Sequence, residues 1–349
     1  MYSITPVIYV WIGTSLPRWC KESLKFSSYN NPKRKFILIS DSEKSRLDFA
    51  KDLINLEIIS IRNGYNKSII FQSKSLFKGK FWKFTSLRFE VLNNFLMGNN
   101  IKSFFHAEFD NLLFNFDGLE KKLDKVGNGF FVPRDNLDRG IGSFIYCNNK
   151  TCIEEILKKY LSTNNARNDM EALGLCLKEK NNFFSLPTES FHQNSENWNI
   201  LNPVDCGGIF DAAAIGQYCL GIDPNNNRYK PTYNFFKNEN LLIDFESEII
   251  TSNKKELYIN YIANNERIKI YNLHVHSKNI KLAISFIRKG PLYYSFSSKK
   301  RKIIAHHHKI YFGSFIKLYD LIVLIIKRII KRIIKTFLYA ITKIYKNKN

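Results

Sequence analysis

Closely spaced cysteines are missing from this chain of 349 residues. No two of its six cysteines form a CxxC pair, so the pattern fits neither a zinc ribbon nor a small disulfide-rich scaffold. We expect reduced, mostly buried thiols, as in a cytosolic protein. The six positions are Cys20, Cys147, Cys152, Cys176, Cys206 and Cys219.

Two kinds of long apolar segment are also missing. The N-terminal residues enter a strand-like run directly, without the basic region and long apolar core of a secretory signal, so we expect no such signal. The longest uncharged run of the basic C-terminal segment, residues 321–326, is far shorter than the roughly 20 residues of a membrane-spanning helix.

Apolar and basic residues, in contrast, are abundant. Apolar residues make up 44% of the sequence and include 29 phenylalanines, enough for a sizeable core. The length suits one large α/β domain with an appendage, or two domains. The net charge of +22 is unevenly spread: residues 299–349 hold 14 Lys/Arg and one acid, Asp320, which gives +13 there and +9 elsewhere.

Strand-like runs alternate with helix-like segments over residues 6–190. This alternation predicts an α/β fold with a mainly parallel sheet and helices on both faces. Residues 254–271 mix a helix-like stretch with a strand. The predicted strands are residues 7–12, 36–39, 56–61, 104–109, 129–132 and 143–146. The predicted helices are residues 21–26, 45–53, 81–96, 152–161 and 170–178.

The most informative segment is FFHAEFDN, residues 104–111, an apolar strand that ends in Glu108 and Asp110. Side chains two apart on an extended backbone point the same way, so both carboxylates can reach one hard cation such as Mg²⁺ or Mn²⁺. The alternative is a pair of solvated acids on a loop. Gly13 and Asp41 also follow predicted strands, and ligands of such sheets bind beyond the carboxyl ends of the strands.

Two groups of histidines offer further metal ligands. His274 and His276 stand two apart on a strand-like segment, so either can complete a site begun by Asp110. The alternative is a pair of solvated or core-capping histidines. The three consecutive histidines at residues 306–308 cannot converge on one metal, and we interpret them as basic surface.

The order of these motifs resembles that of nucleotide-sugar-dependent glycosyltransferases of the GT-A fold. Among these, the chain resembles bacterial glycosyltransferases of surface-polysaccharide gene clusters, which share segments like FDAAAIGQYLGGIDP and NLHIHSK. Here the first of these reads FDAAAIGQYCLGIDP. The segments that carry the resemblance, over roughly residues 6–280, are VIYVWIGTSLP, FWKFTSLRFEVL, HAEFDNLLF, NDMEAL and NLHVHSK.

The resemblance implies a GT-A-like, Rossmann-like sheet with a divalent metal, Mn²⁺ or Mg²⁺. Asp110 matches the metal-binding aspartate of a DxD-type motif, and Glu108 matches its partner. The sequence departs from the motif by having Glu at the first position. His274 or His276 matches a histidine near the C-terminal end of the catalytic core.

The same resemblance places a nucleotide-sugar donor against the turn at Ile12 and Gly13 and against Asp41. Lys83 and Arg88, on the helix before the acidic strand, offer cationic contacts to the donor diphosphate. The alternative for both is a solvated helix face.

On the acceptor side, the resemblance supplies one candidate, and the Gly-rich segment at residues 205–228 supplies two more. Asp169, or else Glu171, matches an acidic residue at a helix start and is the candidate general base; a plain helix N-cap is the alternative for Asp169. Asp211 and Asp223 are candidates for the acceptor or sugar pocket, since carboxylates bind hydroxyls by charge-assisted hydrogen bonds. They fit equally well as turn residues that satisfy local backbone donors.

These motifs favour one functional hypothesis over two alternatives. We expect a metal-dependent glycosyltransferase that moves a sugar from a nucleotide-sugar donor to a glycan or lipid-linked acceptor in surface-polysaccharide synthesis. One alternative is a sugar-phosphate nucleotidyltransferase, although VWIGTSLPR has little glycine for a phosphate loop of that class. The other is a non-catalytic, membrane-associated module with a nucleotide-binding fold.

The C-terminal segment predicts an amphipathic basic helix. Residues 316–345 contain no Pro or Gly, and Lys327, Lys331 and Lys335 repeat at a spacing of four, with isoleucines on much of the opposite side. Such a helix suits an anionic membrane surface, because its clustered cations oppose insertion across a bilayer. Packing on the catalytic domain is the alternative. Nucleic acid is disfavoured, because binding a duplex does not need the apolar face.

The chain therefore divides into three predicted parts. Residues 1–290 form a GT-A-like catalytic domain, residues 291–312 a basic linker, and residues 313–349 a membrane-associating helix. We expect a cytoplasmic protein, held peripherally on the inner face of the plasma membrane, with no nucleic-acid partner.

Overall fold

The computed structural model describes most of the chain up to residue 305. The described residues are 5–13, 15–41, 53, 55–61, 81–162, 166, 168–189, 200–216, 248–252, 256–261, 266–288, 294–297 and 302–305. The predicted helices at 45–53 (except Leu53) and 313–349 lie outside them, as do Asp223 and residues 306–308. Among the described residues, no helix has both the length and the apolar character needed to span a bilayer.

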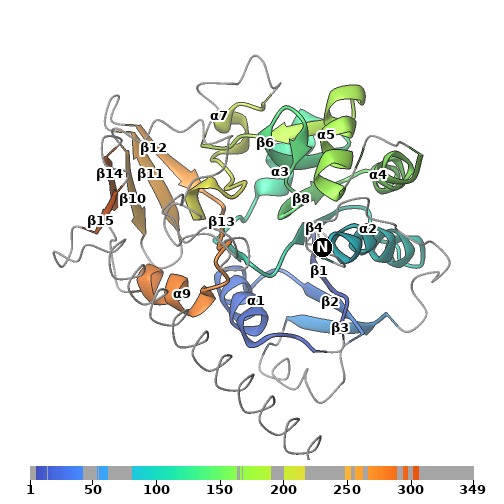
Figure 1. The fold of residues 1–349 in the computed structure, drawn as a ribbon, viewed down its shortest axis with the longest axis horizontal. Coiled ribbons are helices and arrows are strands. Elements are labelled where there is room, and N and C mark those ends of the chain that lie inside the picture. Colours follow the sequence, from blue (N-terminus) through green and yellow to red (C-terminus); the bar gives the residue numbers. More distant parts are fainter. Residues whose placement is uncertain are drawn as a thin grey trace, which may run out of the picture.

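The largest element is a mixed sheet of eight strands in the order β3-β2-β1-β4-β8-β6-β7, with β9 beside β6 (Figure 1). Strands β3, β2, β1 and β4 are mutually parallel, whereas β8 runs antiparallel to β4 and β6. This confirms the predicted α/β fold with a mostly parallel sheet. The strands are β1 (Val7–Trp11), β2 (Phe36–Ser40), β3 (Leu56–Ser60), β4 (Phe104–Ala107), β6 (Phe130–Asn136), β7 (Arg139–Gly140), β8 (Phe144–Cys147) and β9 (Phe183–Leu186).

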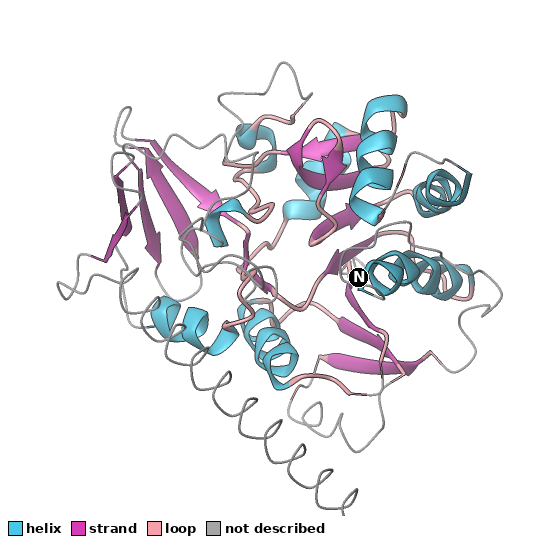
Figure 2. Cartoon of the chain, in the orientation of Figure 1, coloured by secondary structure: helices cyan, strands magenta, loops and turns pink. Residues whose placement is uncertain are grey.

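Helices cover both faces of this sheet (Figure 2). Alternation along β1 explains the layers: Val7 and Tyr9 pack toward α1 and α3, and Ile8 packs toward α2, α4 and α5. Burying each such side chain fully contributes about 1.5–3 kcal/mol. The helices are α1 (Arg18–Asn30), α2 (Phe81–Met97), α3 (Leu119–Val126), α4 (Thr151–Ser162) and α5 (Asp169–Glu179).

Helices α1, α2, α4 and α5 correspond to predicted helices, whereas α3 was not predicted. The short helix predicted at residues 21–26 is the middle of the longer helix α1. In α2, Leu87 and Val91 are buried, but Phe84 is 42% exposed although helical spacing places it on the same apolar face.

A second sheet has five antiparallel strands in the order β12-β11-β10-β14-β15. Its buried residues Leu257, Ile259 and Ile268 form a core with helix α9 (Ile280–Arg288). The helix-like stretch predicted within residues 254–271 is wrong, because the described part of that segment forms β11 and β12. The strands are β10 (Glu248–Ser252), β11 (Leu257–Tyr261), β12 (Glu266–Ile270), β14 (Tyr294–Ser297) and β15 (Lys302–Ala305).

The C-terminal part of this sheet lies inside a segment predicted to be a linker. Strands β14 and β15 pair with each other, and β14 pairs with β10, so residues 294–297 and 302–305 belong to a sheet. The proposed domain boundary at residue 290 stays a prediction.

A short pair of strands connects distant parts of the sequence. Strand β5 (Asn111–Leu113) pairs antiparallel with β13 (Asn272–His274). The β5–β13 pair therefore brings the residues after the acidic motif next to the histidine motif.

Helix α7 (Pro203–Cys206) begins with an Asn202 cap and ends at Gly207 in a left-handed conformation.

The cysteines agree with the expectation of buried thiols. The five described cysteines are free and buried. Burial raises the pKa of Cys152, Cys176 and Cys206 to about 12, so these thiols stay protonated and unreactive at neutral pH.

Candidate metal and donor site

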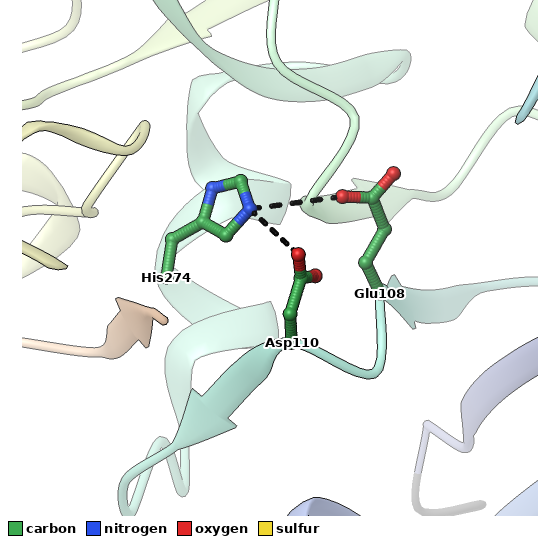
Figure 3. Close-up of side chains that lie close together, drawn as sticks. All are labelled: Glu108, Asp110 and His274. Atoms are coloured by element: carbon green, nitrogen blue, oxygen red, sulfur yellow. Dashed lines mark hydrogen bonds and ion pairs between the residues drawn. The ribbon is translucent and has the colours of Figure 1, made fainter. Parts of the chain in front are cut away.

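The two acids of the HAEFDN segment lie in a turn beyond the end of β4. The Asn111 N–H bonds to the Glu108 carbonyl at 3.1 Å, and the Glu108 N–H bonds to the Ser143 carbonyl at 3.0 Å. The prediction that both acids stand on an extended strand is wrong, because β4 ends at Ala107. The turn nevertheless brings the carboxylates of Glu108 and Asp110 close together (Figure 3).

His274 joins the two acids from a distant part of the chain. Strand β5 follows Asp110 directly and pairs with β13, which places His274 opposite Asn111. The Val275 N–H then bonds to the Asp110 carbonyl at 2.7 Å. As a result, His274 Nε2 lies 3.3 Å from Asp110 Oδ2 and 3.9 Å from Glu108 Oε2 (Figure 3).

These three side chains fit a divalent metal. Among the described residues, Glu108, Asp110 and His274 form the one group whose ligand atoms all lie within 4.8 Å of one another. Carboxylate oxygens with an imidazole nitrogen suit Mn²⁺ or Mg²⁺. His274 Nδ1 faces the Ala212 carbonyl at 3.4 Å, a contact of the kind that orients a metal-binding imidazole. His276 lies outside this group, with its ring centre 5.8 Å from that of His274.

A lysine that the sequence analysis gave no role lies in the same place. Lys278 Nζ bonds to Asp110 Oδ2 and lies 5.6 Å from the centre of the Trp19 ring. An ammonium group bonded to Asp110 marks this position as one that attracts cations. The sequence feature that could have indicated Lys278 is its position four residues after His274, at the end of NLHVHSK.

The charges of the site reinforce one another. Burial favours a higher pKa for Asp110, but Lys278 and His274 outweigh it and hold this pKa well below its usual range. Burial favours a lower pKa for His274, yet attraction to Asp110 and Glu108 raises it above its ordinary value. The arrangement therefore favours an ionised Asp110, and both ring nitrogens of His274 face oxygen acceptors.

Arg88 lies behind the acids and not on a solvated helix face. Its side chain is 8% exposed, and Nη1 donates to Glu108 Oε1 while Nη2 donates to Asp169 Oδ2 at 2.8 Å. Burial favours a lower pKa for Arg88, but Glu108 and Asp169 raise it. Direct contact between Arg88 and a donor stays a prediction. Lys83 lies in the first turn of α2, and its side chain is outside the described structure.

Asp169 is the first residue of α5 and is not its cap. The cap is Asn168, whose side chain accepts the Glu171 N–H at 3.0 Å. The Asp169 carboxylate is 3% exposed and accepts bonds from Arg88 and from Thr85 Oγ1, the latter at 3.2 Å. Burial is the main reason that the pKa of Asp169 is raised. Its bonds connect Asp169 to Arg88, while Glu171 is partly exposed on the same helical turn, and a general base at either position stays a prediction.

Asp211 holds the backbone that carries His274 and does not line a pocket. Its Oδ1 accepts the N–H groups of Ala213 (2.9 Å) and Ile215 (3.0 Å), and its Oδ2 accepts those of Gly216 (2.8 Å) and His274 (2.9 Å). Four backbone donors and complete burial leave this carboxylate no surface for a sugar. The turn-residue alternative is therefore the correct one for Asp211.

Two buried asparagines complete the junction, and the sequence analysis did not identify them. Asn272 Nδ2 donates to Asn111 Oδ1 at 2.9 Å and to the Asp211 carbonyl at 3.0 Å. Asn111 Nδ2 in turn donates to the Ser143 carbonyl at 2.6 Å. Asn111 lies within the quoted segment HAEFDNLLF and Asn272 begins NLHVHSK, and these positions were the available signal.

The predicted nucleotide side of the site forms a separate small unit. The Gly13 N–H bonds to Asp41 Oδ1 at 2.5 Å, which links the ends of β1 and β2. Gly13 has a φ of 151°, which favours glycine, and Ile12 beside it is partly buried. These residues lie at the carboxyl edge of the sheet, as does the acidic turn after β4, which is the edge where α/β sheets bind ligands.

Comparison with known proteins gives partial structural likenesses. The chain is similar to mouse xyloside xylosyltransferase 1 at 9% identity, covering 56% of this chain and 93% of that one, with a TM-score of 0.34. It is similar to the galactosyltransferase LgtC, in complex with donor and acceptor sugar analogues, at 12% identity, with coverage of 53% and 74% and a TM-score of 0.38. A cytidylyltransferase from Leptospira borgpetersenii is similar at 13% identity, with coverage of 53% and 76% and a TM-score of 0.34.

No family model and no curated protein matches the chain. Structural likenesses of this size do not distinguish a sugar transferase from a nucleotidyltransferase. The side chains at the carboxyl edge of the sheet are the better guide to activity.

Proposed function

We propose that this protein is a metal-dependent glycosyltransferase that moves a sugar from a nucleotide-sugar donor to a glycan or lipid-linked acceptor. The observation that carries the proposal is the convergence of Glu108, Asp110 and His274 beyond the carboxyl ends of parallel strands. This edge is where α/β sheets bind nucleotides, and this ligand set suits a divalent metal on a diphosphate. The sequence resemblance to glycosyltransferases of surface-polysaccharide clusters supports the same activity.

The metal site is proposed to consist of Asp110 and His274, with Glu108 beside them. A bound Mn²⁺ or Mg²⁺ neutralises the charge that grows on a departing nucleoside diphosphate. The protein keeps His274 Nε2 directed at Asp110 through the Ala212 carbonyl behind the ring and through Asp211, which binds the His274 N–H. A site held by backbone on both sides needs little rearrangement to bind a cation.

Lys278 is proposed to act on the donor phosphates. Its ammonium group bonds to Asp110, beside the atoms that form the metal group. A diphosphate bound there offers Lys278 stronger charge-assisted hydrogen bonds than one carboxylate. Moving from Asp110 to the phosphate oxygens, Lys278 leaves Asp110 to the metal and stabilises the leaving group.

The nucleotide is proposed to lie against Ile12, Gly13 and Asp41. The Gly13–Asp41 bond fixes this turn in advance, so that ordering it on binding costs little.

A donor-hydrolysis screen tests the proposed activity. The purified full-length protein is incubated with common UDP-, GDP- and CMP-sugars, with Mn²⁺ or with a chelator. We expect one donor to release its nucleotide, and this release to require the metal. If no nucleotide sugar is bound or hydrolysed under any condition, the proposal is wrong.

We also propose peripheral attachment to the inner face of the plasma membrane through residues 313–349. The support is sequence alone: a basic stripe backed by isoleucines. Replacing Lys327, Lys331 and Lys335 with Glu should move the full-length protein from the membrane fraction to the soluble fraction, as should deletion of the segment. Unchanged fractionation of both variants would refute surface attachment.

A further inference from the structure

Arg88 makes a contact that the proposed chemistry does not itself require. Its guanidinium group bridges Glu108 and Asp169, which belong to the turn after β4 and to the start of α5. One arginine on α2 thus bonds to carboxylates from two other elements. A planar guanidinium is suited to such a double contact, because it holds its donors in a fixed fork.

The two oxygens of Glu108 face different partners. Oε1 accepts the Arg88 bond, whereas Oε2 lies 3.9 Å from His274 Nε2 (Figure 3). The Arg88 bond therefore fixes the rotation of the carboxylate so that Oε2 is directed at the metal group. Glutamate has one more rotatable bond than aspartate, so without this bond Glu108 has more orientations to lose on binding a metal.

The surrounding chain gives the guanidinium a fitted position. On the far side, Thr85 Oγ1 bonds to the second oxygen of Asp169 and holds that carboxylate in place. Gly142 has no side chain where one would collide, since a Cβ there would lie 2.5 Å from Arg88 Nη2. The turn after β4, the start of α5 and the turn at Gly142 thus all help to hold one arginine of α2, which is more than charge balance alone needs.

We propose that Arg88 is a positioning residue, which orients Glu108 toward the metal site and uses Asp169 as its anchor on α5. The inference rests on the proposed function only in taking Glu108, Asp110 and His274 as the metal site. It replaces the expected role of Asp169 as a base and gives the Glu of the DxD-type motif a partner of its own.

Charge and position make opposite predictions for this arginine. If Arg88 only balanced charge, Arg88→Lys would leave Mn²⁺ affinity unchanged, and Arg88→Met would strengthen it by removing a nearby cation. If Arg88 orients Glu108, both variants weaken Mn²⁺ binding, because neither can hold two carboxylates at once. Loss of such a supporting contact typically weakens metal affinity by about 10- to 100-fold.

The test is Mn²⁺ binding to the full-length protein, followed by the electron paramagnetic resonance signal of free Mn²⁺. We expect Arg88→Lys to weaken binding by about 10- to 100-fold, and Asp169→Asn, which keeps the Glu108 bond, to weaken it several-fold. Arg34→Lys is the matched control: it alters another buried arginine–carboxylate pair at the opposite edge of the sheet. Its Mn²⁺ affinity should equal that of the wild type.

Three results would overturn the inference. Wild-type affinity in folded Arg88→Lys or Asp169→Asn means that Arg88 does not orient Glu108. An equal loss in Arg34→Lys means that general destabilisation explains the effect. If the wild type binds no Mn²⁺, the proposed metal site is wrong and the inference is wrong with it. Weaker binding confined to the Arg88 and Asp169 variants supports the inference. Circular dichroism identifies any variant that does not fold, and Asp169→Asn then decides the outcome.

Discussion

Two buried arginines lie at opposite edges of the main sheet, and their surroundings differ in kind. Arg34 precedes β2 and bonds to the Thr5 carbonyl before β1, at the amino edge of these parallel strands. Arg88 bonds to Glu108, which follows β4 at the carboxyl edge. Both side chains are at most 8% exposed, and both pair with carboxylates.

The Arg34 region is balanced within itself. The two terminal guanidinium nitrogens, Nη1 and Nη2, donate to Glu120 at 3.2 Å and 2.7 Å. They also donate to the carbonyls of Thr5 and Phe116. The group also stacks 4.4 Å from the centre of the Phe116 ring. One cation meets one anion, and two backbone carbonyls accept further bonds from the same guanidinium group.

The Arg88 region, in contrast, shares its charges among more partners. Arg88 serves two carboxylates, and the neighbouring Asp110 bonds to Lys278 and His274. Under the proposed function, a metal ion would replace Lys278 here without leaving any carboxylate unpaired. Burial and ion pairing thus occur in both regions, and the difference we propose is that the cation at Asp110 is exchangeable.

The largest expected effect is on activity at the Arg88 end. Asp110→Asn keeps the size of the side chain but removes the charge that holds the metal. We expect donor turnover to fall about a thousandfold, which corresponds to the several kcal/mol that a metal supplies to charge stabilisation. Steady-state kinetics with Mn²⁺ measure the loss, and a near-normal urea midpoint checks the fold. Full activity in this variant would show that Asp110 is not needed for turnover, and the Arg88 region would then not differ in function from the Arg34 region.

The next effect is on stability at the Arg34 end. Arg34→Met removes the partner of Glu120 and of two carbonyls, so we expect the free energy of unfolding to fall by about 3 kcal/mol. Urea denaturation measures it, and turnover per folded molecule should stay normal. A variant that is stable but inactive would place Arg34 in the functional class as well.

A smaller effect tests whether the cation at Asp110 is exchangeable. Lys278→Met removes the ammonium group that competes with a metal, so we expect Mn²⁺ to bind about tenfold more tightly while donor turnover falls. Lys281→Met is the control, because Lys281 is a more exposed lysine on α9, 3.9 Å from Glu22. Weaker Mn²⁺ binding in Lys278→Met would show that the lysine supports the metal and does not stand in its place.

The smallest effect concerns a surface pair outside both regions. The Lys178 ammonium bonds to Asp138 at 2.5 Å and holds the pKa of Asp138 below its ordinary value. Because the pKa is lower in the folded state, the stabilisation is present above about pH 4 and is lost as the pH falls through the folded-state pKa. Asp138→Asn should therefore cost a few tenths of a kcal/mol at pH 7 and nothing near about pH 2. Urea denaturation at both pH values measures it, and an equal cost at both would exclude an ionic origin.

Much of the fold could be predicted from local pattern. The strands β1, β2 and β4 are apolar runs because both their faces are buried, and the helices on either side carry clear apolar faces. The five-stranded sheet was harder to recognise. Strands such as β12 (ERIKI) alternate charged and apolar residues over a length too short to separate from a helical turn.

The candidate site shows the same limit. Two acids spaced two apart after a strand were enough to propose Glu108 and Asp110 as one site, and His274 or His276 could be proposed as their partner. The choice of His274 over His276, and the roles of Lys278 and Asp211, depend on how β13 pairs with β5. Pairing across such a distance leaves no trace in the local pattern of either segment.

That pairing of β5 with β13 also sets the time at which the site can exist. The proposed metal ligands Asp110 and His274 are 164 residues apart in sequence, so their contact belongs to the slow, non-local class of folding events. During synthesis the acidic turn leaves the ribosome long before its histidine, and in that interval the complete ligand set cannot form. Under the proposed function, metal binding therefore has to wait until both parts of the chain have been made and β13 has paired with β5.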